Sequence, residues 1–389
     1  MTKLGNIEKF FKLHYFIVIN FIQTFGQIIV GAEQPEAYLN FLKSKKVGLV
    51  VNQTSMVKNV HLVDFLISNQ INVNFIFAPE HGFRGISDAG EKIDDYIDKK
   101  TGIPVLSLYG KNKKPPQNIV NQLDVIVFDL QDVGVRFYTY ISTLHYILES
   151  CVEYDKELII FDRPNPNGMH VNGPVLDLKF KSFVGMHPIP ILHGLTVGEL
   201  ASMILGEGWV KNQSYKKLKI VTVKNYTHQT QYDLPIKPSP NLPNKKAIEW
   251  YASLALFEAT PISVGRGTDI PFQIIGYPNP IFGNFQFIPK PIQGMCKNPP
   301  HAGNICYGID LRNETVENGF SLKYLIDFYN KYPDKVNFFQ ASFFDKLAGT
   351  DKLRKQIMEG KSESEIKQSW QEELEEYKKI RKKYLLYKE

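Results

Sequence analysis

Cysteine is scarce in this sequence, with only Cys151, Cys296 and Cys306 in a chain of 389 residues. Three cysteines make neither a disulfide-dense scaffold nor a CxxC metal site. At most, Cys296 and Cys306 could pair in an oxidising compartment. The composition, 43% hydrophobic and 22% charged, is instead that of a globular chain long enough to bury a sizeable core.

Several motifs that mark common enzyme classes are also missing. The sequence has no GxSxG, GxxxxGK[ST], HExxH or GxGxxG pattern. The sequence therefore lacks the motifs that would indicate a serine hydrolase, a nucleotide-binding protein, a zincin or a dinucleotide enzyme. We expect no cofactor and no bound metal. The net charge of +6 is modest, and the basic residues are dispersed except near the C-terminus, so nucleic acid is not an expected partner.

The first 32 residues differ from the rest of the chain. Lys3, Lys9 and Lys12 precede the apolar run FIVINFIQTFGQIIVGA, which ends in Gly31 and Ala32. This layout is typical of a secretory signal peptide. Polar residues interrupt the run and shorten any spanning segment, although a membrane anchor or a buried first helix is the alternative. We therefore expect residues 1–32 to be a leader, and the mature protein to be exported, periplasmic or secreted, without stable membrane insertion.

From Lys45 onward, short β-branched runs alternate with helical stretches. The runs KVGLVVN, VNFIFAP, DVIVFDLQD and ELIIFDRPN are continuously apolar and are separated by helical patterns. This order predicts a parallel sheet covered on both faces, which is an α/β domain. One helix should begin near Tyr138 and bury a stripe of residues at spacings of three and four, namely Ile141, Leu144, Ile147, Leu148 and Cys151.

The composition changes at about Tyr226 to proline, asparagine and aromatic residues, as in PIKPSPNLPNKK and GYPNPIFGNFQFIPKP. Prolines at this density favour turns and edge strands. The expected division is an α/β domain over 33–230 and a smaller, Pro-rich α+β domain over 231–389. A closing helix should begin near Ser362, where SESE resembles a capping box. It should pack back on the body through an apolar stripe of Ile366, Trp370, Leu374, Tyr377 and Tyr384.

Polar residues follow four of the predicted strands. In open α/β sheets, ligands bind beyond the carboxyl ends of the strands, where several loops converge. One polar strand end would be an ordinary cap or turn, but four on one edge indicate a polar site. The four segments are Asn52-Gln53-Thr54, Pro79-Glu80-His81, Asp129-Leu130-Gln131-Asp132 and Asp162-Arg163-Pro164-Asn165.

The segment IFAPEHGFRG supplies the candidate acid. A carboxyl group held between Pro79, Phe83 and the sheet edge would be partly desolvated, which makes Glu80 a plausible general acid. The two glycines allow a tight bend. Arg84 could pair with Glu80 or with an anionic substrate, and a plain surface salt bridge is the alternative.

Cationic residues lie further along the chain. Arg136 and Tyr138 follow Asp132 at a helix start, and Arg266 lies between two glycines, which would expose a rigid bidentate donor for a carboxylate or phosphate. His193 follows the segment PIPIL and could equally be an ordinary buried histidine. Carboxylates combined with arginines in an exported protein indicate acid/base chemistry on a polar, anionic, extracytoplasmic substrate.

A set of ordered motifs carries a family resemblance. PEHGFRG, DVIVFDLQDVGVRFYTYISTL, DRPNPNG, SFVGMHPIPILHGLTVGELA, PSPNLP and LFEATPISVGRGTDIPF together resemble the NamZ-type exo-β-N-acetylmuramidases, glycoside hydrolase family 171. The similarity runs in order from about Lys45 to the closing RKKYLLY. It implies a Rossmann-like N-terminal domain, a smaller C-terminal domain and an active site in the cleft between them.

The resemblance also implies an activity and a set of residues. The activity is release of N-acetylmuramic acid (MurNAc) from the non-reducing end of peptidoglycan fragments, so MurNAc-GlcNAc saccharides are the expected partners. Glu80 matches the family's proposed acid, and Asp132 and His81 are further candidates for catalysis. The other motif positions that would line the cleft are Arg84, Asp129, Arg136, Tyr138, Asp162, Arg163, His193 and Arg266.

One position departs from the family pattern. Many relatives have glutamate in a Ser-Glu-Gly-Arg-Gly-Thr segment where this chain has Val264, which cannot ionise. A second catalytic carboxylate would then have to come from Glu91, Asp129, Asp132 or Glu258, of which Asp132 is favoured. Assistance by the substrate's own N-acetyl group would need no second carboxylate.

An arginine is expected to select the substrate. Choosing muramic acid over glucosamine requires a cation for the lactyl carboxylate, and the candidates in order of preference are Arg266, Arg136 and Arg163.

Two other functions are possible on the sequence alone. A cell-wall binding protein without turnover is one alternative, kept open by Val264. A metal-dependent hydrolase is the other; it would use His81, Asp129, Asp132 and His193, although their spacing is not that of a metal site.

Overall fold

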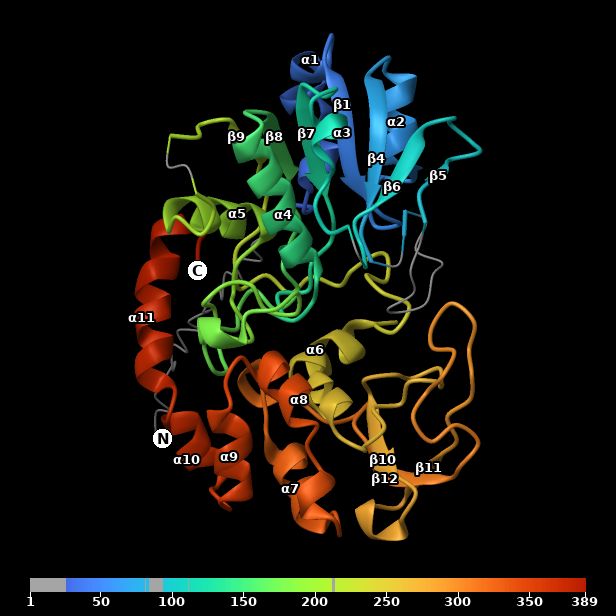
Figure 1. Ribbon diagram of the computed structural model, residues 1–389, viewed down its shortest axis with the longest axis vertical. Helices are drawn as coiled ribbons and strands as arrows, with labels where there is room; N and C mark the ends of the chain where they lie inside the picture. Colours follow the sequence, from blue (N-terminus) through green and yellow to red (C-terminus); the bar gives the residue numbers. More distant parts are fainter. Residues whose placement is uncertain (1–25, 81, 84–93, 111, 212–213) are drawn as a thin grey trace, which may run out of the picture.

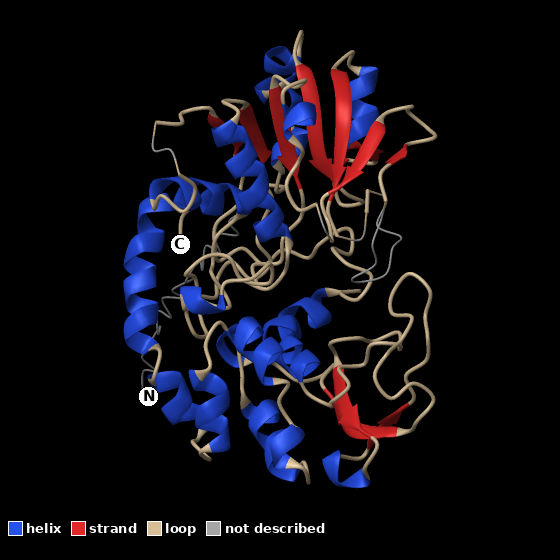
Figure 2. Cartoon of the chain, viewed as in Figure 1, coloured by secondary structure: helices blue, strands red, loops and turns tan. Residues whose placement is uncertain are grey.

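The computed structural model describes residues 26–80, 82–83, 94–110, 112–211 and 214–389. His81, Arg84 and Glu91, and most of the expected leader, lie outside the described residues. In Figure 1 the chain builds an upper half around a large sheet and a lower half of helices with a small sheet. Figure 2 separates the strands of the two sheets clearly.

The large sheet has seven strands in the order β5-β6-β4-β1-β7-β8-β9. All neighbours pair in parallel except β5, which is antiparallel to β6 at the edge. The predicted α/β architecture is confirmed. The strands are β1 (Lys46–Val51), β4 (Asn72–Ala78), β5 (Tyr96–Ile97), β6 (Pro104–Ser107), β7 (Val125–Asp129), β8 (Glu157–Phe161) and β9 (Leu218–Val221).

Both faces of this sheet are covered, which explains the continuously apolar strands. Along β7, Ile126 and Phe128 pack with α4 (Tyr140–Glu153) and α5 (Val197–Gly206), whereas Val125 and Val127 pack on the other face. That second face is covered by α1 (Leu39–Leu42) and α2 (Leu62–Ser68), beside the β2 (Met56–Val57) and β3 (Val60–His61) hairpin. The short α3 (Gln117–Val120) contacts α4.

The strand order reverses next to β1, which defines where a ligand site is expected. From β1 the chain moves outward to β4 and β6 on one side, and from β7 to β8 and β9 on the other. At such a switch point the loops beyond the carboxyl ends of the two central strands diverge and leave a crevice. The segments after β1, β4 and β7 are therefore placed to form a site.

The helix expected near Tyr138 begins two residues later, as α4 at Tyr140. All five residues of its predicted apolar stripe are buried, so that prediction is confirmed.

The lower half is the smaller α+β domain that the composition predicted. Its three-stranded antiparallel sheet, in the order β10-β12-β11, lies at one side of a helical layer (Figure 2). The elements are α6 (Lys245–Leu254), β10 (Ile274–Tyr277), β11 (Phe285–Phe287), β12 (Cys306–Asp310), α7 (Lys323–Lys331), α8 (Ala341–Ala348) and α9 (Lys352–Met358). Cys296 and Cys306 are free thiols.

The C-terminal segment differs from the single helix that the sequence predicted. The Ser362 capping box with Glu365 is present, but α10 (Glu363–Gln368) stops before α11 (Gln371–Arg381). The chain bends where the hydroxyl of Ser369 donates to the Ile366 carbonyl at 2.7 Å and the Trp370 side chain enters the core. Helix α11 then runs back to the upper half (Figure 1), as the apolar stripe predicted.

The described part of the N-terminus is built into the fold. Ile29 pairs with Lys224, the Gly31 amide donates to the Asp162 carbonyl at 2.9 Å, and the Tyr38 hydroxyl donates to the Ala32 carbonyl at 2.7 Å. The end of the expected leader thus packs against the large sheet. Among the described residues, no helix combines the length and the apolar character needed to cross a bilayer.

Candidate active site

The polar strand ends lie at one edge of the sheet, and three of the four segments are joined by hydrogen bonds. The Gln131 amide donates to Thr54 Oγ1 at 3.2 Å, and Gln131 Nε2 donates to the Pro164 carbonyl at 2.8 Å. Asn52 Nδ2 donates to the Tyr140 hydroxyl at 2.8 Å. Segments that are far apart in sequence therefore form one connected polar layer next to the N-terminus of α4.

Glu80 is held by residues from two further elements. The Thr139 hydroxyl donates to Glu80 Oε2 at 2.7 Å, and the Tyr109 hydroxyl, which follows β6, also hydrogen-bonds this side chain. Burial, with a contribution from the Glu80 charge, raises the pKa of the Tyr109 phenol well above its ordinary value. Thr139 is the N-cap residue of α4, yet its hydroxyl makes no capping bond. This position normally uses a hydroxyl to cap the helix, so here the hydroxyl is available to orient Glu80.

Glu80 lines a cavity of about 60 Å³ between the two halves of the molecule. Aromatic side chains form much of its wall, and Arg266 lies at the side contributed by the C-terminal half. The other lining residues are Phe137, Tyr138, Thr139, Tyr140, Ser239, Asn241, Leu242, Tyr251 and Phe272.

Three tyrosines form a wall of edge-to-face rings. Tyr138 lies 4.8 Å from Tyr140 and 6.1 Å from Tyr251, measured between ring centroids. The Tyr138 hydroxyl donates to the Pro238 carbonyl at 2.8 Å, which ties the loop before α6 to the start of α4. Burial raises the pKa of all three phenols, and the nearby Asp132 charge adds to the effect. These hydroxyls are therefore neutral donors at physiological pH.

Arg266 is fixed by a carboxylate and an aromatic ring. Its Nε bonds to Glu258 Oε1, and its guanidinium lies 5.1 Å from the Phe272 ring centroid. Burial opposes the charge, but Glu258 outweighs it and raises the pKa of Arg266. The flanking Gly265 and Gly267 have φ values of 77° and 80°, which side chains rarely tolerate, so the predicted rigid Gly-Arg-Gly loop is present.

Asp132 and His193 are buried and are not among the residues that line the cavity, although the Asp132 charge acts on the three tyrosines. Asp132 Oδ2 accepts from the Gly134 amide at 2.7 Å and lies 3.8 Å from His193 Nε2. Both side chains are buried, and Asp132 Oδ1 has no hydrogen-bond partner among the described residues. Asp132 therefore acts on the cavity through its field on the tyrosines rather than by contact.

Asp129 and Arg163 form a buried pair between the ends of β7 and β8. Arg163 donates from Nε to Asp129 Oδ1 at 2.6 Å and from a terminal nitrogen to Oδ2 at 2.9 Å. Each charge is matched by the other, so neither faces the Glu80 cavity with an unmatched charge.

Arg136 and Asp162 have structural partners instead. Arg136 is completely buried and donates to four backbone carbonyls, those of Pro174, Ile189, Leu347 and Ala348. Burial lowers the pKa of Arg136 to about 9. Asp162 accepts from Thr196, Gly198 and the Tyr387 hydroxyl, which fastens the C-terminal tail to the end of β8. Among the described residues, neither side chain lines the Glu80 cavity.

The roles of several site residues were not predicted from the sequence. Tyr109, Thr139 and Tyr251 reach Glu80 or its cavity from three separate elements, and Glu258 was considered only as a carboxylate, not as the partner of Arg266. The N-cap position of Thr139, directly before a strongly apolar helix, was the one available clue. Val264 is buried in the main core and does not line the cavity, although its carbonyl accepts from the amide of the lining residue Phe272 at 2.8 Å.

The chemical content of the cavity defines a class of enzyme. A carboxylate held by two hydroxyls, rings suited to the faces of a sugar and a fixed guanidinium are the equipment of acid/base chemistry on an anionic saccharide. The described residues contain no cluster of three or more His, Cys, Asp or Glu side chains suited to a metal. The fold and the site are those of a glycoside hydrolase.

Comparisons with known proteins identify the family. The family models "Exo-beta-N-acetylmuramidase NamZ, N-terminal" and "Exo-beta-N-acetylmuramidase NamZ, C-terminal" match residues 47–246 and 249–387. The chain is 38% identical over 373 residues to the peptidoglycan beta-N-acetylmuramidase NamZ of Bacillus subtilis, covering 90% of this chain and 89% of that protein. This chain therefore belongs to the NamZ family.

Two crystal structures of DUF1343 family proteins from Bacteroides fragilis share the fold. One is 48% identical with a TM-score of 0.86, and the other is 26% identical with a TM-score of 0.80. Each comparison covers 93% of this chain and 99% of the other. The architecture of both halves is thus shared with these two proteins.

Proposed function

We propose that this protein is an exo-acting glycoside hydrolase that releases N-acetylmuramic acid from the non-reducing end of peptidoglycan fragments, with Glu80 as the general acid. The observation that carries the proposal is the position of Glu80. It is oriented by Thr139 and Tyr109 and lines the same cavity as Arg266. The family membership supports the substrate class, because the Bacillus subtilis relative is named for activity on peptidoglycan.

In this proposal Glu80 transfers a proton to the glycosidic oxygen as the bond to the departing sugar breaks. Arg266 binds the lactyl carboxylate that distinguishes muramic acid from glucosamine, since its Glu258 pair leaves the terminal nitrogens as a directed fork. The neutral hydroxyls and rings of Tyr138 and Tyr251 contact the part of the muramyl unit that enters the cavity, since the cavity volume of about 60 Å³ is less than that of one sugar ring.

The group that would assist Glu80 by attacking the anomeric carbon or activating water is not found in the part of the cavity wall that the structure describes. Asp132 was the favoured carboxylate, but it is buried and is not among the described residues that line the cavity. We therefore favour attack by the substrate's acetamido oxygen, with Asp132 stabilising positive charge at a distance. This route retains the anomeric configuration, so NMR of the freshly released sugar tests it. Inversion would instead require a base that activates water, and Asp132→Asn would then be the next variant.

The activity is tested with two isomeric disaccharides. MurNAc-GlcNAc should release N-acetylmuramic acid, detected by mass spectrometry, and GlcNAc-MurNAc should not. Glu80→Gln should abolish release while still binding the disaccharide, and Glu372→Gln, an exposed position on α11, serves as the matched control. Binding without turnover by the unaltered chain would support the alternative of a cell-wall binding protein.

We also propose that the protein is exported and that its leader ends before Ile29. The contacts of Ile29, Gly31 and Ala32 with the body support this boundary, because cleavage after Ala32 would remove packed residues. N-terminal sequencing of the protein recovered from the periplasm or medium tests it. A mature chain that begins at Glu33, or one retained in the cytoplasm, would contradict it.

A further inference from the structure

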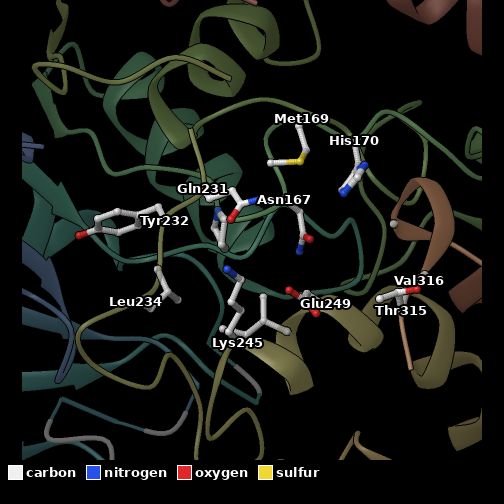
Figure 3. A pocket seen from close by; sticks show the side chains of 13 residues that line it. Asn167, Met169, His170, Gln231, Tyr232, Leu234, Lys245, Glu249, Thr315 and Val316 are labelled. Carbon is white, nitrogen blue, oxygen red and sulfur yellow. The ribbon is translucent and has the colours of Figure 1, made fainter. Parts of the chain in front are cut away.

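A second cavity, of about 220 Å³, lies at the junction of the two halves and shares no lining residue with the Glu80 cavity. Figure 3 shows its wall. Three parts of the chain contribute: the DRPNPNGMH segment after β8, the segment before α6 together with α6 itself, and residues 315–319 of the C-terminal half.

The two halves meet closely here. Gly319 has a φ of 73°, and a side chain at that position would lie 2.7 Å from the His170 ring. Asn172 Nδ2 donates to the Asn318 carbonyl at 3.2 Å. The cavity is therefore enclosed by both halves, a frequent location for ligand sites.

Neutral polar groups on the wall of this cavity keep unused hydrogen-bonding capacity. In Figure 3 the side chains of Asn167, His170 and Gln231 lie along the upper side of the lining, above Lys245 and Glu249. Asn167 is 4% exposed, and its Nδ2 donates to the Val133 carbonyl. Among the described residues, Asn167 Oδ1, the His170 ring and the Gln231 amide have no hydrogen-bond partner. Burial lowers the pKa of His170, so its ring is neutral at physiological pH.

Charge at the wall is balanced. Lys245 pairs with Asp233 at 3.0 Å, and Glu249 lies on the same helix and pairs with Lys246 at 3.0 Å. A ligand with net charge would gain little from two opposite charges that already have partners. The polar groups of Asn167, His170 and Gln231 that have no hydrogen-bond partner in the described part of the chain instead require a ligand that offers several hydrogen-bond donors and acceptors.

The apolar part of the wall and the volume of the cavity further restrict which ligand it can bind. Met169, Leu234, Ile248 and Val316 supply apolar surface beside the amides. Because a water molecule occupies about 30 Å³ in the liquid, the cavity has room for about seven waters, which corresponds to one sugar ring with its substituents rather than a chain. Hydroxyl groups satisfy imidazole and amide partners equally, and an acetamido group combines an amide with a methyl that suits the apolar wall.

We propose that this cavity is a second, non-catalytic site that binds a single N-acetylated hexosamine unit. Asn167, His170 and Gln231 bind its hydroxyl and amide groups, and the acetyl methyl packs on the apolar side chains. The inference does not depend on Glu80 being the catalytic acid.

The test uses N-acetylglucosamine, which has no glycosidic bond to cleave, with the full chain. Ligand-observed NMR titration gives the affinity, and a crystal soaked with the sugar gives its position. Gln231→Ala and His170→Ala should each weaken binding about tenfold, the effect of losing one or two hydrogen bonds. Neither side chain has a protein hydrogen-bond partner among the described residues, so both variants should keep the melting temperature of the parent chain.

Gln117→Ala makes the same chemical change at an exposed position and should leave binding unchanged. The proposal is overturned if N-acetylglucosamine shows no saturable binding. It is equally overturned if saturable binding survives both cavity variants at full strength, or if the soaked crystal holds the sugar only in the Glu80 cavity.

Discussion

Removing the Thr139 hydroxyl tests whether Glu80 must be oriented to work. Thr139→Val keeps the shape of the side chain but deletes the donor that lies 2.7 Å from Glu80 Oε2. The helix should be little affected, because this hydroxyl makes no capping bond on α4. We therefore expect a loss of activity without a matching loss of stability.

The size of the loss follows from the contacts. As Glu80 gives up its proton it becomes a carboxylate, and a hydrogen bond to such a charged group is worth about 1.5 to 3 kcal/mol, which corresponds to roughly 10-fold to 150-fold in rate. Tyr109 still bonds to Glu80 in the variant, so we expect the lower end, about 10-fold to 30-fold in kcat/KM. Thr139→Ser restores the hydroxyl and should stay within about threefold of the parent chain.

The assay is release of N-acetylmuramic acid from MurNAc-GlcNAc, with the melting temperature measured in parallel. Thr143→Val is the matched control, since Thr143 is buried one turn further along α4 and its hydroxyl makes no hydrogen bond among the described residues. If Glu80→Gln abolishes release but Thr139→Val keeps full activity, the orienting role is refuted. If Glu80→Gln itself remains active, the assignment of the acid fails first.

Three further predictions concern charged residues. Arg266→Lys keeps the charge but loses the fork, so KM for MurNAc-GlcNAc should rise about tenfold with kcat little changed, and an unchanged KM would remove Arg266 from carboxylate binding. Burial raises the pKa of Asp162 from 3.8 to about 6, so the stability that it contributes is complete below about pH 4 and is lost as the pH rises to about 6. The difference in free energy of unfolding between the parent chain and Asp162→Asn should accordingly fall by up to about 3 kcal/mol over that window, and a flat difference in melting curves against pH would contradict it. Arg136→Met leaves four backbone carbonyls without a donor and should destabilise the fold by about 3 kcal/mol or more in urea unfolding, whereas a shift below about 1 kcal/mol would show that water replaces the guanidinium.

Local patterns were read correctly where the periodicity of a single element decides the outcome. The stripe of α4 is buried as its spacing predicted, and the capping box at Ser362 starts a helix. The continuously apolar strands form a parallel sheet covered on both faces. In each case the side-chain pattern follows directly from the geometry of one helix or strand, so no distant partner is needed to read it.

The break between α10 and α11 was missed for the opposite reason, because a distant part of the chain decides it. The apolar stripe continues through Trp370, and the sequence there contains neither proline nor glycine. What interrupts the helix is the insertion of the Trp370 side chain into the core, and that core is supplied by residues such as Phe320 from a distant part of the chain.

The candidate site, too, was predictable in part from local sequence and in part only from the folded chain. The sequence by itself determined that polar residues end four parallel strands at one edge, and that Arg266 lies in a rigid glycine-flanked loop. It could not decide which of those residues face a cavity. Arg136 and Asp162 look like site residues in the sequence, yet one is bound to backbone carbonyls and the other to the C-terminal tail. Only the tertiary structure decided this, because the groups that compete for each charge, and those that orient Glu80, come from segments that meet only when the chain is folded.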